Sequence, residues 1–259
     1  MFLNYCKKTL SIFIHSFKLD TRIAITALID AIFWLLTTLT ALMAKNHILT
    51  QAHTLQLANL SPQGLANQAL ATNTLSLMRW FFINASIALA LTLFIIAILY
   101  TLSRGCIWLL LLNKKPSKTY FLGFFKLNLT WWLIWLIPAI LTFIGLKPNF
   151  VAPILGIEFA IYIHFTTLLH RTYAEKKTLS EVYTTAFHLG NKVHVFILPY
   201  TLAFITYWIF FQLFRFLPQD NTKLLFASAL FFLIVFLAWF RNYFLCFSSS
   251  LLAHTRNKM

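Results

Sequence analysis

Six stretches of the chain are apolar for long enough to cross a membrane. A helix needs about 20 apolar residues to span the roughly 30 Å hydrocarbon core of a bilayer. Stretches of about this length lie at 23–44, 80–103, 129–146, 150–170, 194–216 and 224–246. The pattern therefore predicts an all-α fold, a polytopic integral membrane bundle of six transmembrane helices.

Polar segments connect these stretches. GLKPNF at 145–150 and LPQDNTK at 217–223 each carry a proline and predict tight turns within helical hairpins. The segment 45–78 is the one long hydrophilic connection, and Ser61 followed by Pro62 predicts a short helix within it. The N-terminus places apolar residues before its first charges, so we expect the first span to be retained rather than removed as a signal peptide.

The composition agrees with a bilayer as the surrounding solvent. Of the 259 residues, 60% are hydrophobic and 10% are charged, which is more apolar surface than one soluble core can bury. We therefore predict a single integral membrane domain over residues 1–259.

Lysine and arginine predict the orientation of this domain. Cytoplasmic loops of membrane proteins carry an excess of these residues. Five of them fall on one predicted side, Lys45, Arg79, Lys147, Arg215 and Lys223, and the other 16 fall on the opposite side or at its boundary. We expect both termini to be cytoplasmic in the cell membrane. The net charge of +15 then reflects topology and attraction to anionic lipid headgroups rather than nucleic-acid binding.

Three basic segments resemble one another along the chain. KKTLSIFIHSFKL begins at Lys7, KKPSKTYFLGFFKL at Lys114 and KKTLSEVYTTAFHL at Lys176, and each contains Phe, a basic residue and Leu before a span. The likeness predicts three parallel repeats. Their units run over about 7–113, 114–175 and 176–259, and the outer loop at about 45–78 is an insertion in the first.

Each repeat is predicted to begin with an amphipathic interfacial helix. In the third copy an apolar stripe recurs at helical spacing, Thr178 and Glu181 form a capping box, and Gly190 predicts the helix end. The stripe comprises Leu179, Val182, Tyr183, Ala186 and Phe187. We expect the three helices to lie in the membrane plane, with lysines toward headgroups and aromatic residues toward acyl chains.

The FHLGNK segment that leads into a span, the lysine-led helices and the six-span plan resemble a family of uncharacterised prokaryotic membrane proteins. These are related to the membrane domain found beside some glycerophosphodiester phosphodiesterases. The resemblance covers most of the chain and implies fold and membrane location. Phosphodiesterase activity belongs to a separate soluble domain in those proteins, so the resemblance transfers no catalytic residue.

Ionisable residues inside spans mark candidate sites because they are costly in lipid. Asp30 lies in the first predicted span, and Glu158 and His164 lie in the fourth on different helix faces. Arg104 and Arg241 lie near inner boundaries, at depths from which either can reach Asp30. Asp30, Glu158 and His164 form either a proton or cation relay or interhelical pairs that fix helix register. We favour the second interpretation.

The sequence contains no motif of a nucleotide-binding, zinc-protease or serine-hydrolase site. Cys6, Cys106 and Cys246 lie far apart without CxxC spacing, which predicts no disulfide framework. His47 and His53 are spaced wrongly for zinc on one helix face. We predict no catalytic residue, metal or cofactor.

Two classes of function remain. The first is a non-enzymatic multi-pass membrane protein that interacts with lipid, or with a membrane protein partner, through its basic helices. The alternative is a small transporter or permease with Asp30 and Glu158 as coupling groups, and an intramembrane enzyme ranks third. A water-filled cavity that reaches Asp30 would favour transport.

Overall fold

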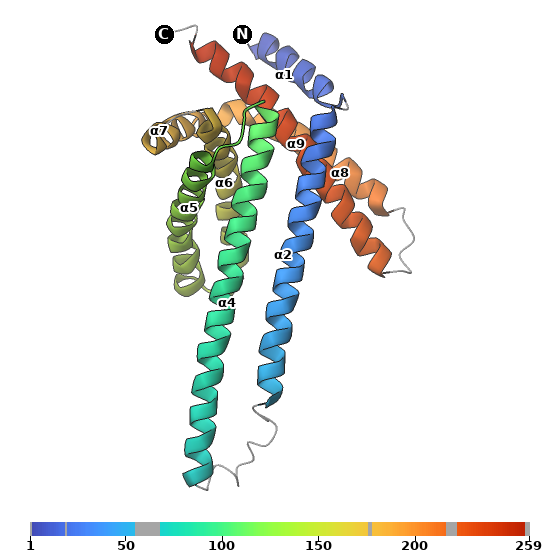
Figure 1. The fold of residues 1–259 in the computed structure, drawn as a ribbon. Coiled ribbons are helices and arrows are strands. Elements are labelled where there is room, and N and C mark those ends of the chain that lie inside the picture. Colours follow the sequence, from blue (N-terminus) through green and yellow to red (C-terminus); the bar gives the residue numbers. More distant parts are fainter. Residues whose placement is uncertain (1, 19, 55–67, 176–177, 216–221, 257–259) are drawn as a thin grey trace. The chain divides into compact units, whose positions relative to one another are not determined.

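The computed structural model describes residues 2–18, 20–54, 68–175, 178–215 and 222–256. Within these ranges the chain is helical, without a strand, and the links between helices are short (Figure 1). The helices are α1 Phe2–Ser16, α2 Thr21–Thr54, α4 Gln68–Leu111, α5 Lys118–Gly145, α6 Pro148–Glu175, α7 Leu179–Gly190, α8 Val193–Arg215 and α9 Thr222–Arg256.

The six predicted spans are confirmed as helices long and apolar enough to cross a membrane. They lie at Thr21–His53, Leu75–Leu111, Lys118–Gly145, Pro148–Glu175, Val193–Gln212 and Ala227–Ser250. The all-α fold is likewise confirmed over the described residues, and the chain has the architecture of a multi-pass membrane protein.

The prediction of a long hydrophilic loop at 45–78 is largely wrong. Helix α2 has 34 residues and continues to Thr54, and α4 has 44 residues and already begins at Gln68. A rise of 1.5 Å per residue gives lengths of about 51 and 66 Å, well beyond the hydrocarbon thickness. The flanking sequences KNHILTQAHT and QALATNTLSLM contain no proline or glycine, so the helices continue after the apolar pattern ends. Most of the predicted helix at Ser61 falls outside the described residues.

The chain divides into two compact units. Unit 1 comprises Met1–Ala31 with Leu102–Met259, and unit 2 comprises Ile32–Thr101. Within unit 2, the ring of Phe33 meets Trp34 and Tyr100 edge-on, with ring centroids 5.6 and 6.1 Å apart. The candidate residues named above all belong to unit 1.

The core of unit 1 is rich in aromatic side chains. Helix α5 packs on α6, α7 packs on α6, and α1 packs on α8 and α9 (Figure 1). Trp131 of α5 lies at the centre of one cluster and donates a hydrogen bond from Nε1 to Thr166 Oγ1 of α6 at 2.7 Å. The larger buried side chains of this core are Trp108, Phe124, Leu127, Trp131, Leu168, Leu169, Phe196 and Phe244.

Only two of the three basic segments that begin the predicted repeats are separate helices among the described residues. Helix α1 is separated from α2 near Asp20, whose side chain accepts from the backbone N–H of Arg22, and α7 ends at Gly190 as predicted. The second segment is instead the beginning of α5, which starts after the N-cap Ser117 and runs without interruption into its span. FFKLNLTWW contains no proline or glycine, so this segment continues as one helix.

Candidate functional site

A buried charge cluster joins three helices of unit 1. Asp30 of α2 is fully buried, and each of its carboxylate oxygens accepts from a different arginine, Oδ1 from Arg104 of α4 and Oδ2 from Arg241 of α9. The sequence places both arginines at depths from which they can reach Asp30, and both make this contact. One aspartate between two arginines leaves a net charge of +1, and a carboxylate held on both oxygens is fixed in position.

A second buried polar pair lies close to this cluster. A ring nitrogen of His170 in α6 hydrogen-bonds Asn128 Oδ1 in α5 at 2.7 Å, and both residues are buried. His170 is also within electrostatic range of Arg104 and Arg241. Sequence reasoning missed this pair because both residues lie near span ends, where polar residues are common. Their pairing across 42 positions leaves no sequence signal.

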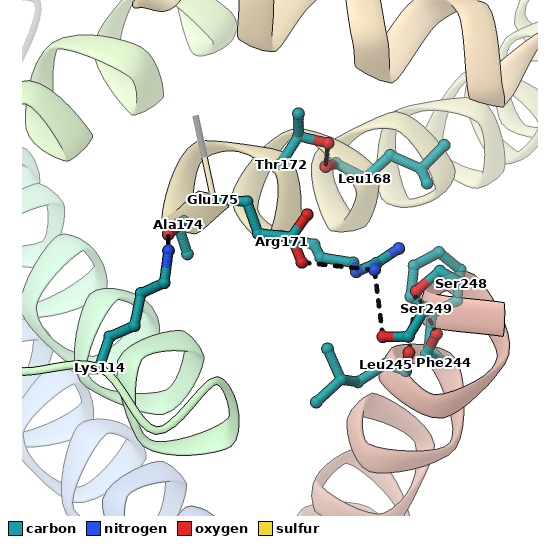
Figure 2. A network of polar contacts seen from close by, with 10 residues as sticks. All are labelled: Lys114, Leu168, Arg171, Thr172, Ala174, Glu175, Phe244, Leu245, Ser248 and Ser249. Atoms are coloured by element: carbon teal, nitrogen blue, oxygen red, sulfur yellow. Dashed lines mark hydrogen bonds and ion pairs between the residues drawn. The ribbon is translucent and has the colours of Figure 1, made fainter. Parts of the chain in front are cut away.

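At the end of α6, Arg171 extends toward α9 (Figure 2). Its Nη2 donates to Ser249 Oγ at 3.1 Å and lies 3.5 Å from Glu175 Oε1. Lys114, which follows α4, donates from Nζ to the carbonyl of Ala174 at 2.5 Å. These contacts connect the lysine-rich ends of α4, α6 and α9, so several basic residues of unit 1 serve to fix helices.

Glu158 lies in a different environment from Asp30. Thr142 Oγ1 of α5 donates to Glu158 Oε1 at 2.6 Å, whereas Oε2 is buried and has no hydrogen-bond partner among the described residues. The side chain lines a groove of about 620 Å³ between α5 and α6. Four of its nine lining residues are aromatic, and Asp30 is not among the lining residues. The two carboxylates therefore do not share a site in unit 1.

His164 connects a third set of helices. One ring nitrogen lies 2.5 Å from the hydroxyl of Tyr200 in α8, and the other lies 3.2 Å from the carbonyl of Gly190 in α7. It contacts neither Asp30 nor Glu158 in these hydrogen bonds. Within the described part of the chain, no group of three or more His, Cys, Asp or Glu residues is placed to hold a metal ion.

Helix α1 has a buried side, and its exposed residues include apolar side chains and lysines. The face toward α8 and α9 includes the buried Thr9 and Ser16, and Trp239 Nε1 donates to Ser16 Oγ at 3.0 Å. Tyr5 donates to the carbonyl of Val195, and burial raises the pKa of its phenol. A second face is apolar and exposed, with Leu10 and Ile14 at 49% and 60% of their accessible area. Lys7 and Lys8 are exposed on the same helix, and Lys18 is exposed two residues after its end at Ser16.

Helix α7 differs from this arrangement. Its apolar stripe packs into unit 1, where Val182 and Ala186 are fully buried against the core formed with α5 and α6. Its exposed positions are Ser180, Glu181, Thr184, Phe187 and His188, of which only Phe187 is apolar. The prediction that this stripe faces acyl chains is therefore wrong for its central residues. Thr178 is confirmed as the N-cap of the predicted capping box, since its Oγ1 accepts from the backbone N–H of Glu181 at 3.4 Å.

Cys6, Cys106 and Cys246 are free thiols in the structure. Comparison of the chain with protein-family models, curated proteins and solved structures found no match. The resemblance to the phosphodiesterase-associated membrane domain therefore stays a prediction, and the functional argument depends on the geometry described above.

Proposed function

We propose that this chain is a non-enzymatic multi-pass membrane protein that holds anionic lipid headgroups along its lysine-rich side. In this proposal α1 is an interfacial helix, both termini are cytoplasmic, and the parallel repeats place basic segments at the same membrane surface. The observation that carries the proposal is the surface of α1, which has an exposed apolar stripe directly beside exposed lysines.

The division of this surface suits the boundary between headgroups and acyl chains. An exposed stripe of Leu10 and Ile14 is unfavourable in water, and the neighbouring lysines are unfavourable in hydrocarbon. At the interface each face meets a matching environment, and lysines near an anionic surface contribute about 1 kcal/mol each. Because α1 is anchored to α8 and α9 through Tyr5 and Ser16, the lipid would be held at a fixed place on the protein.

The buried cluster around Asp30 favours this proposal over transport. A coupling carboxylate must exchange its proton or ion during turnover, and both oxygens of Asp30 are engaged by arginines. Asp30 does not line the groove at Glu158, so these two predicted coupling groups do not lie in that one pocket. We therefore assign Asp30, Arg104 and Arg241 a structural role in holding α2, α4 and α9 together.

Lipid retention by the purified protein tests the proposal. The full chain, in nanodiscs with equal amounts of phosphatidylglycerol and phosphatidylcholine, is released into the gas phase, and the bound lipids are identified by native mass spectrometry. We expect retained phosphatidylglycerol to exceed phosphatidylcholine. Replacing Lys7, Lys8 and Lys18 together by Gln should reduce this preference about tenfold or more, since three interfacial charges are lost.

Two lysines predicted to lie on the opposite side provide the control. Lys45 and Lys147 are exposed, and their replacement by Gln should leave the phosphatidylglycerol preference unchanged. Equal retention of the two lipids by the wild-type protein would overturn the proposal. So would an equal loss in the two sets of variants, because the effect would then reflect overall charge and not α1.

A further inference from the structure

The groove between α5 and α6 combines aromatic walls with one carboxylate. Its lining includes Trp132, Trp135, Phe159 and Tyr162 around Glu158. Trp132 Nε1 donates to the hydroxyl of Tyr162 at 2.9 Å, and the ring centroids of Trp135 and Tyr162 lie 5.8 Å apart. These contacts hold the aromatic walls of the groove in place.

Two polar atoms at this groove lack hydrogen-bond partners within the described structure. They are Glu158 Oε2 and Trp135 Nε1, and both are buried. A buried carboxylate oxygen without a donor costs free energy, and the cost is larger in a membrane because water is scarce there. Thr142 supplies one donor to the other oxygen, so the carboxylate retains an open position for a further donor.

The groove is accessible from the lipid phase. Leu136, Gly156 and Phe159 along it are exposed, which leaves one side open at the surface of unit 1. Glu158 lies ten positions after Pro148, the first residue of α6, or about 15 Å along the helix at 1.5 Å per residue. A ligand must therefore carry an apolar part that partitions into the membrane and a polar part that reaches this depth.

We propose that the groove binds the head of a lipophilic organic ammonium ion, such as a long-chain amine. The ammonium group would donate to Glu158 and lie against the faces of Trp132 and Trp135, and its alkyl chain would leave through the open side. Aromatic faces attract cations through their negative π-surface, and a carboxylate adds a charge-assisted hydrogen bond.

Other ligand classes fit this groove less well. A phosphate or carboxylate headgroup would meet the charge of Glu158 without a lysine or arginine among the lining residues. A metal ion needs several oxygen, nitrogen or sulfur ligands, and the lining offers one carboxylate. A neutral alcohol can use the same space, but it gains neither the ion pair nor the cation–π contact.

Binding of dodecylamine and dodecanol to the full chain tests this inference. The protein is placed in phosphatidylcholine nanodiscs, and the binding of each radiolabelled compound is measured after subtraction of protein-free discs. We expect saturable binding of dodecylamine and none of dodecanol. Glu158→Gln, which preserves an acceptor for Thr142, should weaken amine binding about tenfold, while Glu181→Gln on α7 should have no effect.

A second pair of variants addresses the aromatic wall. Trp135→Leu should weaken amine binding, whereas Trp208→Leu on the exposed face of α8 should not. The comparison of amine with alcohol uses wild-type protein, so it remains decisive if the Glu158 variant fails to fold. A lack of saturable amine binding, equal binding of the alcohol, or full binding by Glu158→Gln would each overturn the proposal. None of these results depends on the lipid preference assigned to α1.

Discussion

Helices α1 and α7 are both short helices that precede a membrane-spanning helix, and their sequences predict the same apolar stripe. In α7 the centre of the stripe is buried in unit 1, and the exposed positions are polar except for Phe187. In α1 the buried face includes Thr9 and Ser16, and Leu10 and Ile14 remain exposed. One helix is therefore part of the protein core, and the other has apolar residues left for a different partner.

The local neighbours of each helix explain this difference. Helix α7 follows α6 closely, and Gly190 allows it to lie directly against Phe165 of that helix. Helix α1 packs on α8 and α9, where the indole of Trp239 needs an acceptor and Ser16 provides it. An apolar stripe thus predicts that a surface will be covered, but the neighbours decide whether protein or lipid covers it.

The largest effect should follow from a charge within the buried stripe of α7. Val182→Asp places a carboxylate in the core without a partner, and we expect a loss of roughly 4 kcal/mol in stability. Thermal unfolding in detergent, followed by intrinsic fluorescence, measures this loss. Thr184→Asp on the exposed face of the same helix should change stability by less than about 0.5 kcal/mol. Similar melting of both variants would contradict the packing of α7.

A smaller loss is expected where α7 meets α6. A Cβ atom at Gly190 would lie 2.3 Å from Cε1 of Phe165, so Gly190→Ala must displace that ring. Overpacking of this kind costs about 1–3 kcal/mol. Gly156→Ala in α6 is the matched control, because its Cβ would meet open space. If both variants melt at the same temperature, α7 does not approach α6 so closely.

The smallest effect on stability should come from the exposed stripe of α1. Ile14→Asp, at a side chain that is mostly exposed, should change the unfolding free energy in detergent by only about 0.5 kcal/mol. The same change should reduce the retention of phosphatidylglycerol in nanodiscs, because a carboxylate then faces the lipid. A loss of stability as large as that of Val182→Asp would show that protein rather than lipid covers Ile14.

The sequence predicts features that depend on one segment or on the depth of a residue in the membrane, and it misses those that depend on how helices are rotated. The spans follow from continuous apolar runs, and the contact of Asp30 with Arg104 and Arg241 follows from their similar depth. Burial of Val182 and the pairing of His170 with Asn128 depend on how each helix is rotated toward its neighbours. Periodicity gives no information about that rotation.

Helix ends also show which features a single segment of sequence can predict. Gly190 and Thr178 mark the ends of α7 correctly because caps act locally. The apolar pattern places the end of the first span near residue 44, yet α2 continues to Thr54, because hydrophobicity reports membrane contact and not helix length. For the same reason the basic segment that begins at Lys114 continues into the span of α5 without a helix end.

The environment of Ile14 tests the proposed role of α1 most directly. A nitroxide spin label at this position, in protein lacking Cys6, Cys106 and Cys246 and placed in nanodiscs, is exposed in turn to oxygen and to a water-soluble nickel chelate. A second label at Thr184 on the exposed polar face of α7 serves as reference. We predict that oxygen relaxes the label at position 14 more strongly, and that the nickel chelate relaxes the label at position 184 more strongly. Stronger relaxation by the nickel chelate at position 14 would contradict the interfacial position of α1 and the lipid-binding function proposed from it.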